Sequence, residues 1–470
     1  MEGKFKNPKK ISPALLVILS FIGVMLIGAF LITTPIARTP LAKQTYGEWG
    51  NFVDSVFMAT SATCVTGFDC YPMGLVNTIN LFGQIVLCIC MQIGGLGFMT
   101  VFFFFLTLIR KKLSFEDRFF ISQAVNSTDV ADVKKFLVKI LVTTGIFEGI
   151  GFLLMLVPMF SLFGYNGEAV WNAFFHTISA FNNSGLDLFG TTSFIREGNE
   201  LLTGMQDWAY YFMCTVVMLL VLFGGISYFV IFDVFTFKKK PHQWTAFTKI
   251  AILMMVTLNI GGMIYFIFSD GIKGSGSLPV FDALFLAVSS RTAGFATYDP
   301  YALSTPGRIF NDILMFIGGS PLGTASGIKT TTLFIIILTI FNYLRGESVH
   351  AFKRYYSKDL IAKSMLVFIS SLFIVLIGYL VLAAFESNNV NQEGIFSGER
   401  CLFETISAFS TTGFTTLMTV QLSAGGKLTC VVLMFLGRLG PITLFSIFSK
   451  NMHIKEDKHV KYVEEDVLIG

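Results

Sequence analysis

Four short stretches of the sequence share one residue pattern that ends in a glycine and an apolar residue. They read FMATSATCVTGF, FHTISAFNNSGL, FLAVSSRTAGF and FETISAFSTTGF. Each begins with Phe, has Ser four residues later and carries a small residue directly before the glycine. The glycines are separated by 118, 109 and 119 residues, close to a quarter of the 470-residue chain each time, and are Gly67, Gly185, Gly294 and Gly413. Because spacing and pattern recur together, we infer a fourfold internal repeat.

The chemistry that suits these stretches is cation coordination by the backbone. Glycine permits conformations that aim successive carbonyl oxygens at one point, and a ring of such oxygens can replace the hydration shell of an ion. A short apolar segment, about 10 to 14 residues long, precedes each glycine loop. As a helix it would direct its partly negative carboxyl end at the same point. Four such loops meeting on one axis would favour a monovalent cation over an anion.

The composition indicates an integral membrane protein. The chain is 53% hydrophobic and 14% charged, with a mean hydropathy of +0.69. Apolar segments of about 20 residues are long enough to cross a bilayer as helices. In hydrocarbon, a non-helical loop persists only where protein buries it or where it lines a water-filled cavity. The glycine loops therefore need membrane-spanning helices around them.

Each quarter is predicted to hold a first span, a short helix that does not cross, a glycine loop and a second span. The expected fold is an all-α membrane protein with eight transmembrane helices and four re-entrant pore loops around a central pore. First spans are expected near residues 11–34, 136–163, 248–268 and 362–385. Second spans are expected near residues 78–109, 209–236, 309–342 and 427–449. The predicted repeats are 1–112, 113–240, 241–347 and 348–449, followed by a tail, 450–470.

Basic residues gather before the first repeat and between repeats. They lie at Lys4–Lys10, Arg110–Lys112, Lys238–Lys240 and Arg345–Lys358. Because basic loops stay on the cytoplasmic side, we expect a multi-pass plasma-membrane protein with both termini cytoplasmic and the glycine loops open to the outside. The first apolar run is longer than that of a signal peptide and no small-residue cleavage site follows it, so it is expected to be retained.

The sequence does not favour an enzyme. His176 lies in the second short helix, and the other four histidines show no HExxH spacing. There is no Walker A or GxGxxG motif, and none of the seven cysteines forms a CxxC pair. We therefore expect no covalent cofactor and no nucleic-acid partner.

With CVTGF, NNSGL, RTAGF and STTGF as its four loops, the chain resembles the Trk/Ktr/HKT superfamily of potassium transporters over essentially its whole length. Among these it is most similar to the bacterial Ktr (KtrB-like) membrane subunits. The resemblance implies a selectivity filter for K+ formed by Cys64, Val65, Thr66, Gly67, Asn183, Ser184, Gly185, Thr292, Ala293, Gly294, Thr411, Thr412 and Gly413. In that superfamily glycine, rather than serine, in the first loop accompanies potassium permeation. Leu186, where the other loops carry Phe, implies a small change in filter geometry and no change of ion.

The stretch GGSPLGTASGIKTTT, residues 318–332, interrupts the second span of the third repeat. Its glycines and proline would break a helix, and a loop at that depth has to line a cavity. A kink that serves packing alone is the alternative. The resemblance implies a gate below the filter, formed by Gly318, Gly319, Gly323, Gly327 and Lys329 together with Arg438.

Two charged residues stand inside predicted spans. Arg438 falls near the bilayer middle, where a charge is costly and normally pairs or lines a pathway. We favour a fixed positive barrier that contacts the gate loop over a purely structural bond to loop carbonyls. Lys329 either acts with Arg438 or extends toward water. Glu148 is interpreted as a buried structural pair or as a cation-coupling group.

The resemblance also implies partners. Ktr membrane subunits form homodimers in which each subunit has its own pore, docked on a ring of cytoplasmic RCK-domain regulatory subunits (KtrA/TrkA-like) that bind nucleotide. The docking surfaces expected here are residues 113–133, 348–358 and the tail after Lys450. Potassium uptake in a lipid membrane is the predicted function, with Na+ as a coupling ion left open. A sodium-permeable or channel-like conductor of the same superfamily is the alternative.

Overall fold

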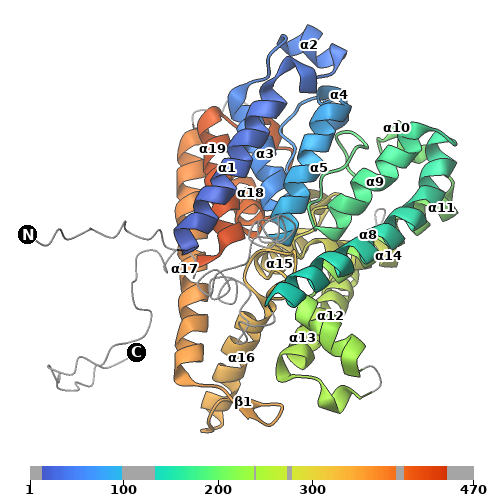
Figure 1. Cartoon of the computed structure of the whole chain (residues 1–470). Coiled ribbons are helices and arrows are strands. Elements are labelled where there is room, and N and C mark those ends of the chain that lie inside the picture. The colour runs from blue at the N-terminus through green and yellow to red at the C-terminus, as the bar shows by residue number, and fades with distance from the viewer. Residues whose placement is uncertain (1–12, 98–132, 238–239, 272–277, 388–395, 442–470) are drawn as a thin grey trace, which may run out of the picture.

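The computed structural model describes residues 13–97, 133–237, 240–271, 278–387 and 396–441. Outside these ranges lie the basic residues at Lys4–Lys10, Arg110–Lys112 and Lys238–Lys239, the ends 98–109 and 442–449 of two predicted second spans, and the tail 450–470. Of the docking segment 113–133 only Val133 is described. Almost every element in the described part is a helix (Figure 1). The one sheet found there is an antiparallel hairpin of β1 (His350–Ala351) and β2 (Arg354–Tyr355).

Four long apolar helices correspond to the predicted first spans. They are α1 (Pro13–Thr33), α8 (Val133–Phe163), α13 (Ala246–Phe266) and α17 (Lys358–Glu386). Within the described ranges, four segments have the length and hydropathy to cross a membrane: 136–163, 207–225, 246–271 and 358–386. Helices of this length and apolar composition are typical of a multi-pass membrane protein.

A short helix precedes each glycine loop. These helices are α3 (Phe52–Cys64), α9 (Gly167–Phe181), α14 (Val280–Ser289) and α18 (Gly398–Ser410). With 15 residues, α9 is slightly longer than expected. Each has an acidic residue in its first turn, which suits the positive end of the helix dipole: Asp54, Glu168, Asp282 and Glu399. The Phe that begins each repeated stretch is buried in the core: Phe57, Phe175, Phe285 and Phe403.

The helices that follow the glycine loops are shorter than the predicted second spans. They are α5 (Leu81–Leu96), α11 (Asp207–Gly225), α15 (Thr305–Phe316) and α19 (Ala424–Leu439). The predicted second span over 209–236 is not one continuous helix, because extended backbone at Ile226 separates α11 from α12 (Tyr228–Phe237). The predicted interruption after α15 is present, and the chain resumes as α16 (Thr330–Leu344).

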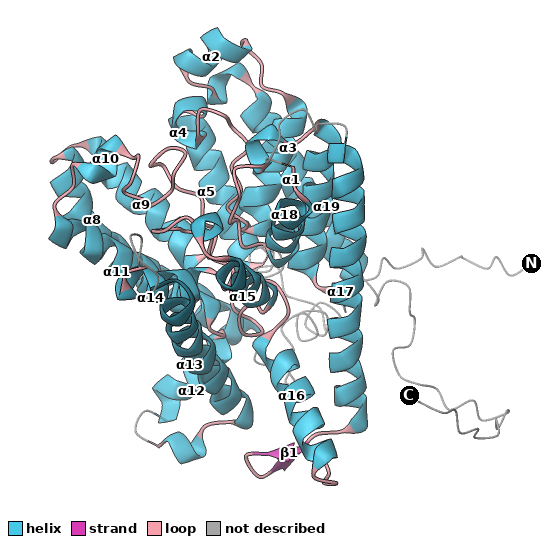
Figure 2. Cartoon of the chain, turned by 180° about the vertical axis from the view of Figure 1, so that it is seen from behind, coloured by secondary structure: helices cyan, strands magenta, loops and turns pink. Residues whose placement is uncertain are grey.

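The short helices and their neighbours form a closed cycle of contacts. The short helix of each predicted repeat packs against the helix that follows the glycine loop of the preceding one: α5 with α9, α11 with α14, α15 with α18, and α19 with α3. The last contact joins the end of the described chain to its beginning. Three connecting helices, α2 (Pro40–Tyr46), α4 (Leu75–Thr78) and α10 (Glu200–Thr203), lie at one end of the molecule, and the β-hairpin lies at the other (Figures 1 and 2).

Candidate functional site

The four glycine loops share one backbone conformation. The residue two positions before each glycine is left-handed, with φ between 53° and 71°: Val65, Asn183, Thr292 and Thr411. The glycines themselves have φ between 76° and 94°. Left-handed backbone is rare for β-branched residues such as Val and Thr, and it persists only where surrounding structure enforces it. Cys64 is the last residue of α3, so it begins this turn from the helix end.

The repeated serine holds each loop against its own short helix. Ser61 and Ser289 donate hydrogen bonds to the carbonyl oxygens of Phe68 (2.9 Å) and Phe295 (2.5 Å). In the second loop, Ser179 donates to the Leu186 carbonyl (2.6 Å). The fourth serine, Ser407, instead accepts from the Gly413 amide (3.1 Å). The Leu186 carbonyl is thus held in the same way as the carbonyls of the Phe residues at that position.

The four loops meet in a ring. A Cβ added to Gly67 would lie closer than 3.0 Å to the carbonyl oxygen of Ser184 in the next loop. The same holds in turn for Gly185 against the Ala293 carbonyl, Gly294 against Thr412 and Gly413 against Thr66. These contacts close a cycle, and they explain why only glycine fits at all four positions. Side chains would displace the backbone of the neighbouring loop.

The ring is rich in oxygen atoms with no other partner. Within the described residues, four buried hydroxyl oxygens of these loops accept or donate no hydrogen bond: those of Thr66, Ser184, Thr292 and Thr411. Uncompensated burial of a hydroxyl costs free energy unless something else satisfies it. Neutral oxygen donors of this kind suit a hard monovalent cation.

Two carboxylates stand directly beyond the ring. Asp69 and Asp187 each follow their loop glycine by two residues, where the other loops carry Ala296 and Thr415. Each carboxylate caps its own turn, with Asp69 accepting from the Tyr71 amide (2.8 Å) and Asp187 from the Phe189 amide (2.9 Å). Burial raises the pKa of Asp69 to about 7 and that of Asp187 to about 6.

Glu404 of α18 was missed by the sequence reasoning. Its fully buried carboxylate accepts from the Thr416 amide (2.8 Å) and from the hydroxyls of Thr415 (2.6 Å) and Thr419 (2.9 Å). The residue at the same position of α9 is His176, whose Nε2 accepts from the Leu188 amide (3.2 Å). Both side chains fix the chain just beyond a glycine loop. His176 therefore has a bracing role in the fold.

The segment between α15 and α16, residues 317–329, forms a loop with a narrow neck. The Gly318 amide donates to the Ile328 carbonyl (2.9 Å), and the Ile328 amide donates to Phe316 (3.2 Å). From this neck the loop reaches α11. There the Ser320 amide donates to the Gly225 carbonyl (3.2 Å), and the Thr324 amide donates to the Gly224 carbonyl (3.0 Å). These bonds use the carbonyls at which α11 stops, which is why that span is broken.

The same loop contacts the second glycine loop. The Thr324 hydroxyl lies 3.3 Å from both the Phe181 carbonyl and Asn183 Oδ1. Asn183 is one of the four left-handed residues of the ring. The loop over 317–329 thus lies directly against the glycine ring.

Arg438, near the end of α19, joins the loop to α5. Its guanidinium donates to the Thr324 carbonyl and to Ser326 Oγ (2.9 Å) on one side. On the other side it donates to the carbonyls of Gly94 and Gly95. Arg438 stands where the other three repeats carry the second glycine of a Gly-Gly pair, which is Gly95 in α5, Gly225 in α11 and Gly319 just after α15. The predicted contact between this arginine and the loop is present.

Two further charged groups face this region. Lys329 donates to the Ala325 carbonyl (2.7 Å), so its chain turns back onto the loop instead of toward water. Glu148 of α8 accepts from Gln92 Nε2 (3.1 Å) and Asn182 Nδ2 (3.3 Å). Among the described residues no Lys or Arg forms an ion pair with Glu148. Its partners are amides, as a structural pairing requires.

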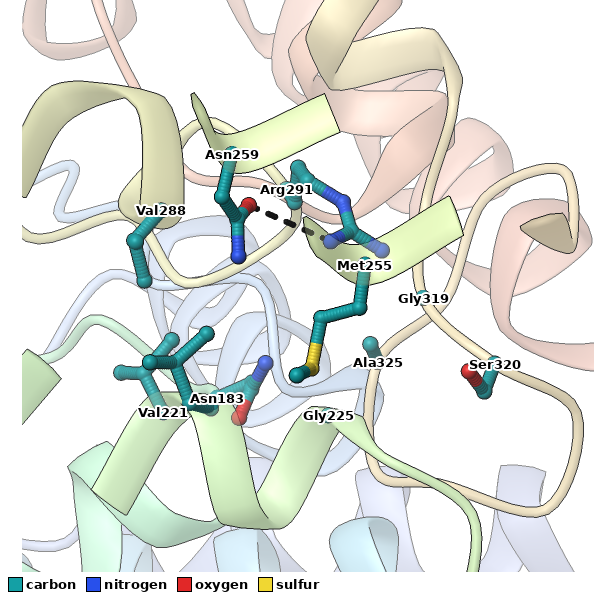
Figure 3. Close-up of a pocket in the computed structure, with 11 residues that line it drawn as sticks. Asn183, Val221, Gly225, Met255, Asn259, Val288, Arg291, Gly319, Ser320 and Ala325 are labelled. Atoms are coloured by element: carbon teal, nitrogen blue, oxygen red, sulfur yellow. Dashed lines mark hydrogen bonds between the residues drawn. The ribbon is translucent and has the colours of Figure 1, made fainter. Parts of the chain in front are cut away.

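Arg291 was also missed. It lies three residues before Gly294, where the other copies have the uncharged Cys64, Asn182 and Ser410. That difference in charge is the signal which could have found it. It donates to Asn259 Oδ1 (3.2 Å) and to the Gly318 carbonyl (3.2 Å) beside a small cavity (Figure 3).

The chain belongs to the TrkH family, described as cation transport protein, which it matches over residues 22–461. It is 32% identical to the Ktr system potassium uptake protein B of Bacillus subtilis, covering 98% of this chain and 97% of that protein. It is 30% identical to the Potassium/sodium uptake protein NtpJ of Enterococcus hirae, covering 98% of both. Its fold is similar to the crystal structure of the potassium transporter TrkH from Vibrio parahaemolyticus, with a TM-score of 0.67 at 15% identity over 96% of this chain and 87% of that one.

These likenesses establish the class as a membrane cation transporter. They also agree with the non-enzymatic interpretation of the sequence, since the family and the relatives are named for transport.

Proposed function

We propose that the protein takes up potassium ions through the ring of glycine loops. The observation that carries this proposal is the closed cycle in which the carbonyls of Thr66, Ser184, Ala293 and Thr412 each abut the glycine of the neighbouring loop. A ring of carbonyl oxygens can replace the hydration shell of a potassium ion. The four short helices end at the ring and add their partly negative carboxyl ends. The names of the Ktr relatives support potassium as the substrate.

In this proposal the chain crosses the membrane eight times, in the four repeats set out above, and the four glycine loops are re-entrant. The end that carries α2, α4 and α10 faces outside, and both termini are cytoplasmic. The loop over 317–329 is the gate. It hydrogen-bonds to residues of the second repeat, and Arg438 links it to the first and fourth, so that it lies across the inner side of the ring. Arg438 adds a fixed positive charge there, which opposes cation passage until the loop moves.

Regulation would come from a separate protein. Ktr proteins are named as parts of a system, and we propose a homodimer docked on a nucleotide-binding RCK subunit through the cytoplasmic segments. The β-hairpin of β1 and β2 lies in one of those segments, 348–358. It projects from the end of the molecule opposite α2, α4 and α10, as a docking surface would (Figure 2).

The test is growth of a potassium-uptake-deficient bacterium at low external potassium. The strain expresses this chain with and without a cognate RCK subunit, and rubidium and sodium uptake are recorded in parallel. Rubidium uptake that rises with the partner is the expected result. Sodium uptake without potassium rescue, in well-expressed protein, would overturn potassium selectivity.

That second outcome would favour a sodium-permeable conductor, the alternative function. One observation supports it: the relative NtpJ carries sodium as well as potassium in its name. The same ring and gate would serve either ion, so the ratio of rubidium to sodium uptake decides between them.

A further inference from the structure

We propose that Arg291 latches the gate loop to the glycine ring. This inference rests on the proposed function, in which the loop over 317–329 is a gate. The latch itself is a contact within the fold. Arg291 directly precedes Thr292, one of the left-handed residues of the ring. Its guanidinium donates to the carbonyl of Gly318, in the neck of the loop (3.2 Å).

The guanidinium has a second anchor. It donates to Oδ1 of Asn259, a residue of α13 that is 7% exposed (Figure 3). The planar fork of arginine can bond two acceptors in fixed geometry, which a lysine ammonium cannot do with the same definition. Arg291 thus ties the loop neck at Gly318 to a long apolar helix and, through its own backbone, to the ring.

The neck transmits that tie to the rest of the loop. Gly318 donates its amide to Ile328, at the other arm, and a Cβ on Gly318 would collide with the Ser326 carbonyl. The two arms are therefore in contact with no room between them. Holding Gly318 also positions Ser326, which receives a bond from Arg438 (2.9 Å).

The surroundings of Arg291 argue against a role in stability alone. The side chain is 8% exposed, its Nε has no hydrogen-bond partner, and no described carboxylate forms an ion pair with it. A buried charge without a counter-charge costs stability, and an apolar residue of similar volume would avoid that cost. Retaining an arginine here fits a group that must release and recapture the loop.

The loop has somewhere to move. A cavity of about 20 Å³ lies beside Arg291 and is lined on the loop side by Gly319, Ser320 and Ala325 (Figure 3). Protein interiors are close-packed, so a void of this kind lowers the cost of shifting the residues next to it. The cavity has room for about one water molecule, so loss of the latch would let side chains next to it shift and would loosen the neck.

The experiment compares Arg291→Gln with Arg308→Gln in purified protein reconstituted in liposomes. Arg308 is a matched control, because it belongs to the same predicted repeat but pairs with Glu399 (2.7 Å) away from the loop. We expect Arg291→Gln to raise rubidium uptake roughly tenfold, as expected for loss of one charge-assisted hydrogen bond, and Arg308→Gln to leave it unchanged. Unchanged uptake in Arg291→Gln would overturn the latch.

Each variant is repeated in protein that lacks residues 319–327. Gly318 remains there, but the loop that it positions is gone, so Arg291→Gln should add no further uptake. An equal increase with and without the loop would overturn the proposal, because Arg291 would then be a charge barrier for cations. Should Arg291→Gln not fold, Arg291→Lys decides by the same comparison, with a smaller increase expected because its ammonium can still donate one hydrogen bond.

Hydrogen exchange separates failure of the latch from failure of the proposed function. The Ser320 and Thr324 amides are bonded to α11, and they should exchange faster in Arg291→Gln than in the native protein or Arg308→Gln. That result supports the latch even if the native chain carries no rubidium. Unchanged exchange at both amides would overturn it.

Discussion

The carbonyl oxygen of Thr66 occupies the space that a Cβ atom on Gly413 would need. The first and fourth glycine loops are therefore in direct backbone contact, and this contact closes the ring. Because each loop abuts the next in this way, the width of the ring is set by backbone atoms and not by side chains. A change in any one loop should alter the whole opening.

Gly67→Ser should weaken discrimination between potassium and sodium. The residue has φ +94°, and a side chain there meets the Ser184 carbonyl, so the strain of about 1 to 3 kcal/mol falls on the ring itself. Competition between rubidium and sodium uptake in liposomes measures the effect. Gly198→Ser is the control, since Gly198 has φ +79° with nothing within 4 Å. If both variants keep native selectivity, the first loop is not part of the filter.

Deleting residues 319–327 should raise rubidium flux several-fold. The deletion removes the bonds that Ser320 and Thr324 make to α11, and with them the part of the loop that contacts the second glycine loop at Asn183. Flux per reconstituted protein is the measurement, and size-exclusion behaviour checks folding. A folded deletion variant with native flux would mean that the loop serves packing alone.

The glycine loops could be predicted from the sequence because their requirement is local and repeated. A positive φ and a close backbone neighbour leave only glycine at each position, so the same residue recurs at the same place. The interruption after α15 was predictable for a similar reason, since glycines and a proline stand together there.

The break after Gly225 was not predictable. Nothing in residues 209–236 forbids a continuous helix as clearly as a proline would. The helix stops because Ser320 and Thr324, about a hundred residues further along the chain, bond the carbonyls at its end. The roles of Arg291 and Glu404 were missed for the same reason, which is that they depend on contacts distant in the sequence. Their partners lie in other segments, and no spacing rule connects an arginine to a glycine carbonyl.

Arg438→Ala should change the transport rate more than the amount of folded protein. The guanidinium bonds the loop at Thr324 and Ser326 and bonds α5 at Gly94 and Gly95, so its loss frees the loop and removes a positive charge beside it. Both effects raise rubidium flux. Initial uptake normalised to purified protein measures it. Native flux in a poorly expressed variant would make this arginine structural.

Glu148→Gln should lower stability and leave the cation dependence of uptake unchanged. The carboxylate accepts from Gln92 and Asn182, and a glutamine would turn one of its acceptors into a donor. One misplaced donor costs about 1 to 3 kcal/mol. Thermal unfolding in detergent and uptake at several sodium concentrations are the two measurements. Lost sodium dependence at native stability would favour the coupling role instead.

Uptake should fall as external pH is lowered from 8 to 5. Burial raises the pKa of Asp69 to about 7 and that of Asp187 to about 6, so both carboxylates are charged at pH 8 and successively neutral below those values. In the proposed ion path, their negative charge would concentrate cations at the entrance of the ring. Rubidium uptake at subsaturating concentration should therefore decline in two overlapping steps.

The contribution of these carboxyls to the free energy of unfolding should rise as the pH is lowered. A carboxyl whose pKa is raised on folding binds protons more tightly when folded, so its contribution favours the folded state at low pH and is lost as pH rises through the folded pKa.

Asp69→Asn should remove the step near pH 7 from the uptake profile. Asp207→Asn is the control, because Asp207 is an exposed carboxylate paired with Arg196 (2.6 Å) away from the ring. An unaltered pH profile in Asp69→Asn would show that this carboxylate does not face the ion path.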